Sequence, residues 1–133
     1  MVIDTSALLA VVFAESDRER FIDSLAEPGQ KLLSAVNALE AAIVAEARKG
    51  PPGGRELDLL LHHARIEVVP FDGTQSEEAR RVWRTFGKGN HAAALNFCDC
   101  CALALSRISG YPLLFKGQDF TRAGAASAMA SPL

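Results

Sequence analysis

Short apolar runs alternate with longer segments of helical periodicity, and this alternation limits the fold more than any other feature of the chain. Four short runs are expected to be strands, at residues 1–4, 31–34, 66–69 and 112–115. Strands joined by helices form parallel sheets, because each crossover returns the chain to the same edge. We therefore predict an α/β fold, with a small parallel sheet of four to five strands flanked by helices on both faces.

The segments between these runs carry apolar residues at helical spacing. Helices are expected at residues 5–15, 16–27, 36–49, 56–64, 74–86 and 97–109. The Gly- and Pro-rich residues 50–54 are expected to be a loop, because both residue types interrupt regular structure. With 133 residues the chain is expected to be a single domain over residues 1–133, in which about residues 121–133 form a short, frayed tail.

Composition restricts the function classes. The net charge is −2 and the pI about 5.9, which does not suit a protein that coats nucleic acid through bulk charge. No apolar stretch approaches the ~20 residues that span a bilayer, and Asp4 falls where a signal peptide would be basic, so we expect a cytoplasmic protein with no membrane contact. The three cysteines, clustered within four residues, are expected to be structural rather than disulfide-bonded or zinc-binding.

Four acidic residues stand where a nuclease would need them: Asp4, Glu40, Asp99 and Asp119. Three of them lie at strand-to-helix switches, where an open parallel sheet presents side chains to a ligand. Carboxylates that lie close together repel unless a proton or a cation neutralises them. A hard divalent ion such as Mg²⁺ takes oxygen ligands and bridges to phosphate oxygens. The pattern predicts a metal-dependent phosphodiesterase.

Each carboxylate taken singly has another interpretation. Asp4, Asp99 and Asp119 could each begin a helix, because Asp satisfies free N–H groups at a helix N-terminus. Glu40 is harder to explain in this way, since it lies in the apolar segment of residues 38–43, where a buried charge needs a partner or a metal. The four acids together, in register with the predicted strands, favour a common site.

Four segments, in order from residue 1 to about residue 120, resemble the motifs of PIN-domain ribonucleases, and more narrowly of the VapC toxins of bacterial toxin–antitoxin pairs. They read MVIDTSA at residues 1–7, ALE at 38–40, LNFCDC at 95–100 and PLLFKGQDF at 112–120. Two features depart from the family pattern. Cys98 stands where Gly is usual, and the tail after Gly124 is rich in Ala and Ser.

This resemblance implies a PIN-like fold and a metal-dependent endoribonuclease that hydrolyses RNA phosphodiester bonds as the toxin of a toxin–antitoxin pair. It implies that the four acids are both the catalytic and the metal-binding residues, with Mg²⁺ or Mn²⁺ as the cofactor. It also implies a cognate, VapB-like antitoxin as partner, a homodimer, and RNA as the substrate.

Further residues have weaker assignments. Thr5 or Ser6 could steady the first carboxylate or a metal-bound water, or simply cap the helix, and Lys116 could touch phosphate or be an exposed lysine at a strand end. Arg80 and Arg84 share a helix face at i, i+4 and could contact RNA or an acidic partner, or form a solvated surface. Trp83 is interpreted as a packing or dimer-contact residue rather than one that stacks on bases.

Three other function classes compete with this one. A receiver-type signalling domain would use Asp72 and Lys116, but its first strand should be followed by an acidic pair, and here Thr5-Ser6 follows Asp4. A haloacid-dehalogenase phosphatase needs an Asp-x-Asp unit, which Asp4-Thr5-Ser6 lacks. A non-catalytic PIN-like binding module would be supported by the loss of an acid, whereas all four are present.

Overall fold

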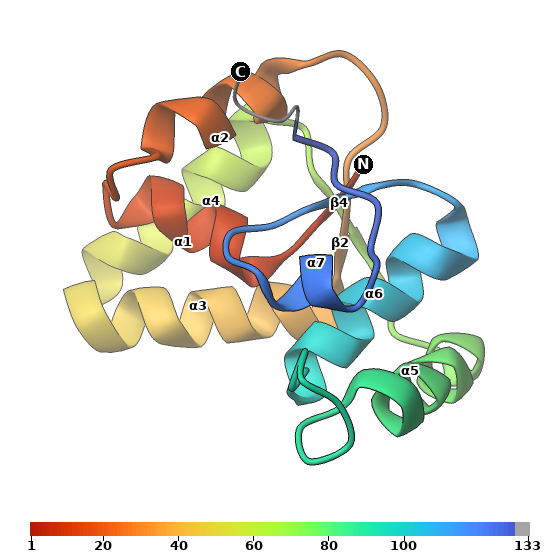
Figure 1. The fold of residues 1–133 in the computed structure, drawn as a ribbon. Coiled ribbons are helices and arrows are strands. Elements are labelled where there is room, and N and C mark those ends of the chain that lie inside the picture. Colours follow the sequence, from red (N-terminus) through yellow and green to blue (C-terminus); the bar gives the residue numbers. More distant parts are fainter. Residues whose placement is uncertain (130–133) are drawn as a thin grey trace.

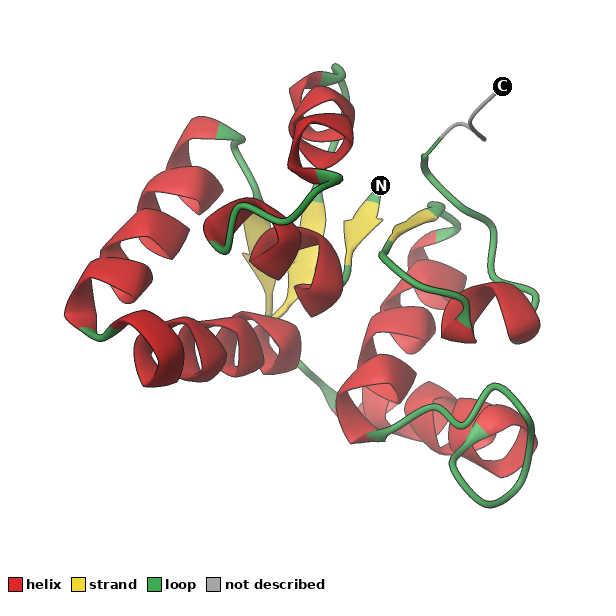
Figure 2. Ribbon diagram, turned by 60° about the vertical axis from the view of Figure 1, so that its left-hand side comes forward, coloured by secondary structure: helices red, strands yellow, loops and turns green. Residues whose placement is uncertain are grey.

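A four-stranded parallel sheet forms the centre of the computed structural model, which describes residues 1–129 (Figures 1 and 2). Its strands are β1 (Val2–Ile3), β2 (Leu32–Ser34), β3 (Glu67–Val69) and β4 (Leu113–Leu114). They lie in the order β3-β2-β1-β4, and every pair is parallel. The predicted fold class is therefore confirmed. The first strand is central, so its carboxyl end lies between the ends of β2 and β4.

Seven helices connect and cover the strands within the described residues. They are α1 (Thr5–Val12), α2 (Arg18–Ala26), α3 (Ala35–Lys49), α4 (Pro51–His63), α5 (Gly73–Phe86), α6 (Phe97–Ser109) and α7 (Asp119–Arg122). None of the helices in this part of the chain is long and apolar enough to cross a membrane.

Alternating side chains of the strands divide the core into two layers. Val2, Leu32 and Leu113 point to the face covered by α5 and α6. Their neighbours Ile3, Leu33 and Leu114 point to the opposite face, which α1 to α4 cover (Figure 1). All six side chains are buried, and this is why β1 and β4 are apolar throughout.

The Gly- and Pro-rich segment is helical, and the prediction of a loop at residues 50–54 was wrong. Helix α4 begins at Pro51, directly after Gly50, which has a φ of 66°. Proline suits the first turn of a helix, because the N–H that it lacks would have no partner there. Gly53 and Gly54 then let α4 pack closely on α3, since a Cβ on Gly53 would lie 2.4 Å from the carbonyl oxygen of Ala45.

The C-terminal segment is more ordered than expected as far as it is described. The backbone N–H of Leu113 donates to Ala126, and the N–H of Ala128 donates to Leu113, so this segment pairs with β4. The side chain of Phe120 is buried against Phe115. The expected frayed tail is therefore tied to the sheet up to residue 128, and residues 130–133 lie outside the described part.

Candidate active site

The structure places the four acids around the carboxyl ends of β1 and β4. Asp4 follows β1 directly and is the N-cap of α1, and Asp119 begins α7 after β4. The two strand ends are adjacent, because the N–H of Asp4 donates to the carbonyl of Leu114 over 2.9 Å. Glu40 lies in the second turn of α3, and Asp99 lies in the first turn of α6. These elements are far apart in sequence and meet at one edge of the sheet (Figure 1).

Asp4 is the most deeply buried of the four, with only 4% of its surface exposed. Its Oδ2 accepts hydrogen bonds from the backbone N–H of Ser6 at 3.0 Å and from the Ser6 hydroxyl at 2.5 Å. Burial, together with the negative charges of Asp99 and Glu40, raises the pKa of Asp4 to about 7, against the two hydrogen bonds from Ser6. Asp4 thus caps a helix and also belongs to an acidic cluster.

Asp99 interacts electrostatically with each of the other three acids. Its carboxylate accepts from the N–H of Asn96 at 3.0 Å, and its own N–H donates to the Asn96 side chain at 2.8 Å, which forms a capping box at the start of α6. Burial raises the pKa of Asp99, and the charges of Glu40 and Asp119 add to that rise, against the bond from Asn96. The electrostatic coupling therefore runs from Asp4 through Asp99 and Glu40 to Asp119.

Asp119 lies at the rim of this cluster. Its side chain is more than half exposed and forms an ion pair with Arg122 at 3.2 Å. Among residues 1–129, no ion pair engages Asp4, Glu40 or Asp99, and no three His, Cys, Asp or Glu side chains form a preformed metal site. The donor set nonetheless fits a hard divalent cation, because every member is a carboxylate and the buried one lacks a counter-charge.

The hydroxyl of Ser6, rather than that of Thr5, contacts the first acid. Ser6 donates to Asp4 and accepts from the backbone N–H of Lys116 at 3.0 Å, so it ties Asp4 to the segment after β4. The Lys116 ammonium already has two partners, Glu15 at 3.1 Å and Asp17 at 3.0 Å, and these bonds raise its pKa. This lysine fastens β4 to the loop between α1 and α2, and a phosphate would have to compete with both carboxylates.

A buried asparagine that the sequence interpretation missed joins three of the site's elements. Asn37 is fully buried, and its Nδ2 donates to the carbonyl of Cys98 at 3.1 Å and to the hydroxyl of Thr5 at 3.4 Å. The Thr5 hydroxyl in turn donates to the carbonyl of Asn37. Asn37 lies three residues before Glu40, one helical turn away, so it fixes α3 against the helices that carry Asp4 and Asp99. The sequence did contain a signal for this role, because an amide side chain in an apolar helical segment close to an acid needs hydrogen-bond partners when it is buried.

Cys98, the second residue of α6, interacts with Glu40 on α3. All three cysteines are free, and Cys100 and Cys101 are buried. Burial raises the pKa of the Cys98 thiol to about 12, as do the hydrogen bond and the charge of Glu40. A thiol with so high a pKa stays protonated at neutral pH, and it is therefore a hydrogen-bonding neighbour of the cluster rather than a nucleophile.

Arg80 and Arg84 lie on the exposed side of α5. No ion pair or hydrogen bond of either side chain is found among residues 1–129, whereas Arg81 on the same helix pairs with Glu78 at 2.9 Å. The two guanidinium groups therefore lie in solvent, which is compatible both with a solvated surface and with a contact to an anionic partner.

Comparison with known proteins gives a consistent result. The PIN domain model matches residues 1–126. Over 120 residues the chain is 52% identical to Ribonuclease VapC30 of Mycobacterium tuberculosis, which covers 90% of this chain and 92% of that protein. It is 49% identical over 120 residues to Ribonuclease VapC of Mycolicibacterium smegmatis, with 90% and 93% covered.

Two solved structures share the fold. The crystal structure of Mycobacterium tuberculosis VapC20, described as a sarcin–ricin loop cleaving toxin, superposes with a TM-score of 0.79 over 97% of this chain and 98% of that one. A toxin–antitoxin complex from Klebsiella pneumoniae matches with a TM-score of 0.67, covering 90% and 88%. Both are 17% identical to this chain, so they support the fold alone.

Proposed function

The chain belongs to the PIN-domain family and, within it, to the VapC ribonuclease toxins of toxin–antitoxin systems, and we propose that it cuts RNA at the acidic cluster around β1 and β4. In this proposal Asp4, Glu40, Asp99 and Asp119 bind Mg²⁺ or Mn²⁺ and are the catalytic residues. Asp4 carries most weight in the assignment. A carboxyl group with a pKa raised to about 7 by burial, beside two further acids and without a cationic partner, is in a state that a divalent cation would relieve.

The side chains of the site have separable tasks. Ser6 fixes the rotamer of Asp4 through two hydrogen bonds, and Asn37 holds α3 so that Glu40 faces the same space. Asp99 is oriented by Asn96. A bound divalent ion would polarise the phosphoryl oxygen and lower the pKa of an attacking water. Asp119, at the exposed rim, would break its ion pair with Arg122 and complete the set of metal ligands when the substrate binds.

Partners follow from the same family. We propose a cognate, VapB-like antitoxin that restrains the nuclease, and action on RNA in the cytoplasm. Membership of the VapC toxins, which belong to toxin–antitoxin systems, supports the first of these. A homodimer is proposed as well, and the exposed apolar pair Leu39 and Ile43, one turn apart on α3, offers a surface for it.

The test is cleavage of a pool of structured RNAs by purified protein with Mg²⁺ and with EDTA. We expect cleavage only with the metal, and a loss of at least about 100-fold in Asp4→Asn and Asp99→Asn, since each variant removes a charged ligand at nearly unchanged shape. Asp58→Asn, at an exposed position of α4, is the matched control and should cleave normally. Circular dichroism of the variants should show folded protein.

Cleavage that persists in EDTA, or that Asp99→Asn and Asp58→Asn reduce equally, would overturn the assignment of the four acids. A folded protein that cleaves no RNA under any metal condition would instead support a non-catalytic binding module.

A further inference from the structure

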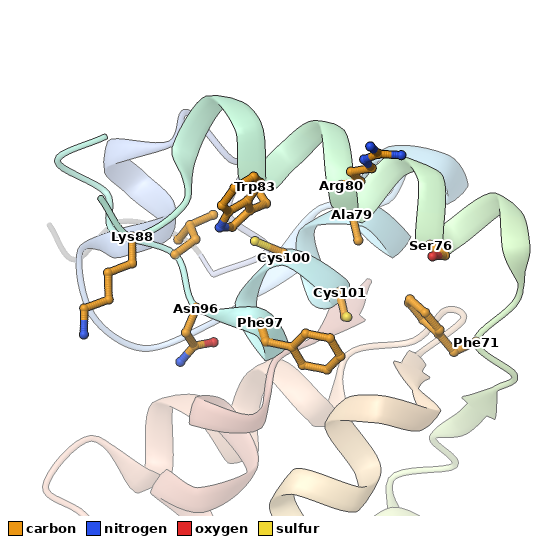
Figure 3. A pocket seen from close by; sticks show the side chains of 11 residues that line it. Phe71, Ser76, Ala79, Arg80, Trp83, Lys88, Asn96, Phe97, Cys100 and Cys101 are labelled. Carbon is orange, nitrogen blue, oxygen red and sulfur yellow. The ribbon is translucent and has the colours of Figure 1, made fainter. Parts of the chain in front are cut away.

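A second candidate site lies between α5 and the start of α6, on another side of α6 from the acids. It is a cavity of about 590 Å³, within the ~300–1,000 Å³ range of ligand pockets. Its walls are mostly apolar and include Phe71, Trp83, Phe97 and Cys100. Figure 3 shows Trp83 on one side of the cavity and Phe97 on the other, with Cys100 between them. None of the side chains of residues 1–129 that line it is acidic.

The aromatic residues at the mouth are unusually exposed. Phe97, the first residue of α6, has 72% of its surface exposed, and Trp83 on α5 has 49% exposed. The Trp83 indole is also held in place, because it packs so closely on Gly87 that a Cβ there would lie 2.4 Å from indole Cδ1. A fixed aromatic platform opposite a second ring is what a flat ligand requires.

Two cations border the same cavity. Arg80 and Lys88 line it from α5 and from the segment after that helix. Neither has an ion pair or side-chain hydrogen bond within the described residues, although acidic residues outnumber basic ones in this chain. Figure 3 shows the two charged ends on opposite sides of the cavity. Unpaired cations beside exposed rings fit single-stranded nucleic acid, which offers phosphates and flat bases together.

We propose that this pocket binds a single-stranded segment of the RNA substrate, with one unpaired base stacked on Trp83 and Phe97 and the adjoining phosphates held by Arg80 and Lys88. The proposal rests on the ribonuclease function proposed above and adds a substrate-binding subsite to it. Trp83 thereby receives a role in stacking on bases, in place of the packing or dimer-contact role expected from the sequence.

The position of the pocket relative to the acids determines which nucleotide of the RNA it can bind. Phe97 and Asp99 are two residues apart on α6, so at about 100° per residue their side chains leave the helix on different sides. The base in the pocket is therefore not the one at the cleaved bond. It belongs to a nucleotide some way along the strand, which passes around the start of α6.

A second copy of the chain fits the pocket less well. A two-fold interface would place the same patch of each copy face to face, and would bring Arg80 and Lys88 of one copy near those of the other. Like charges at short distance oppose such a contact. An acidic peptide would neutralise the cations, but a carboxylate supplies no flat surface for the two rings.

Trp83 is the sole tryptophan, so its fluorescence reports the pocket directly. The probe is a mixed-sequence single-stranded RNA of about 12 nucleotides, within the ~4–16 nucleotides that such sites cover, titrated in EDTA so that no cleavage occurs. We expect saturable quenching of the indole emission. We also expect the apparent affinity for RNA to fall as the salt concentration rises. This fall should be less steep in Arg80→Gln than in Arg55→Gln, which changes an exposed arginine of α4 and serves as the control.

Phe97→Ala should weaken binding by about tenfold and raise KM in the Mg²⁺ cleavage assay with kcat nearly unchanged, as loss of one stacking contact predicts. Phe97→Tyr should restore both, because the ring is kept. Ile108→Ala, at an exposed position near the other end of α6, should change neither.

Unchanged indole emission on addition of RNA, in a protein that cleaves RNA with Mg²⁺, would overturn the subsite and leave the ribonuclease function intact. A protein that fails to cleave at all would count against that function instead.

If Phe97→Ala converts a dimer to a monomer in sedimentation while RNA affinity is unaltered, a second copy occupies the pocket. If only an acidic peptide quenches the emission, a protein partner occupies it. Each of these two results would also overturn the proposal.

Discussion

A single carboxylate, Asp4, must satisfy two demands in this protein. It caps α1 through the N–H of Ser6, and it lies almost without solvent contact beside Asp99 and Glu40. Capping favours the ionised form, whereas burial and like charges favour the protonated one. Burial prevails, since the pKa of Asp4 is raised from 3.8 to about 7.

This raised pKa predicts how the stability of the metal-free protein depends on pH. The folded state holds a proton on Asp4 that the unfolded state has already lost above about pH 4. The resulting stabilisation is complete below that pH and is lost as the pH rises towards about 7. At about 1.4 kcal/mol for each unit of pKa difference, the free energy of unfolding should fall by up to about 4 kcal/mol across this window.

Asp4→Asn should remove that fall, because the amide keeps the shape and does not ionise. Urea denaturation in EDTA at about pH 5 and about pH 8 measures the effect, and the variant should be the more stable protein at the higher pH. Asp58→Asn serves as the exposed control on α4. Parallel stability curves for the variant and the unchanged protein would contradict the raised pKa.

The residues of the site were not equally predictable from sequence. The four acids stood out as a set, because three of them lie at strand-to-helix switches and Glu40 lies in an apolar segment, and the structure places all four around one edge of the sheet. The roles of Thr5 and Ser6 could not be separated, since only the direction of each hydroxyl distinguishes them. Asn37 was missed, because its partners Thr5 and Cys98 are 32 and 61 residues away.

At the level of elements, the junction of α3 and α4 shows how tertiary contact outweighs local propensity. Glycine and proline predicted a loop there, whereas the strands and helices α1, α2, α3, α5 and α6 were predicted nearly in place. The short helix α7 was not among the predicted helices. Propensity failed because Gly50 supplies the turn, Pro51 begins the next helix, and Gly53 is needed for the close approach of α3. That last contact depends on a neighbouring helix, which local sequence patterns do not describe.

Gly53→Ala should therefore destabilise the protein, although replacing Gly by Ala inside a helix usually adds up to about 1 kcal/mol of stability. The new Cβ would lie 2.4 Å from the carbonyl oxygen of Ala45 and 2.9 Å from Cβ of Lys49. We expect a loss of about 1–3 kcal/mol in the free energy of unfolding, as for other overpacked sites.

The matched substitution is Gly73→Ala, at the first residue of α5, where a Cβ would meet nothing within 4 Å. It should leave stability unchanged or raise it by a few tenths of a kcal/mol. Chemical denaturation of both variants decides the question by the sign of the difference. If Gly53→Ala proves the more stable of the two, the helices are not in close contact at this position.

On the scale of the whole molecule, the acids join parts of the chain that the core separates. Asp4 lies at the sheet, Glu40 on α3 in one layer, and Asp99 on α6 in the other (Figure 2). Repulsion between them acts on both layers at once, so it opposes closure of the molecule at this edge. A cation held in common would relieve that repulsion and stabilise the global fold.

Mg²⁺ should accordingly raise the melting temperature of the metal-free protein. A ligand that binds only the folded state contributes RT ln(1 + [L]/Kd), which is about 2.7 kcal/mol at one hundred times Kd. For a domain of this size that corresponds to a rise of roughly 10 °C. Asp99→Asn should lose most of the rise, because Asp99 is coupled to both Glu40 and Asp119. Asp58→Asn should keep the whole rise in melting temperature.

Differential scanning calorimetry at about pH 8, where Asp4 is largely ionised, makes the comparison, with NaCl at matched ionic strength as the second control. An equal rise with NaCl would mean that salt screens the acids and that no ion is bound among them.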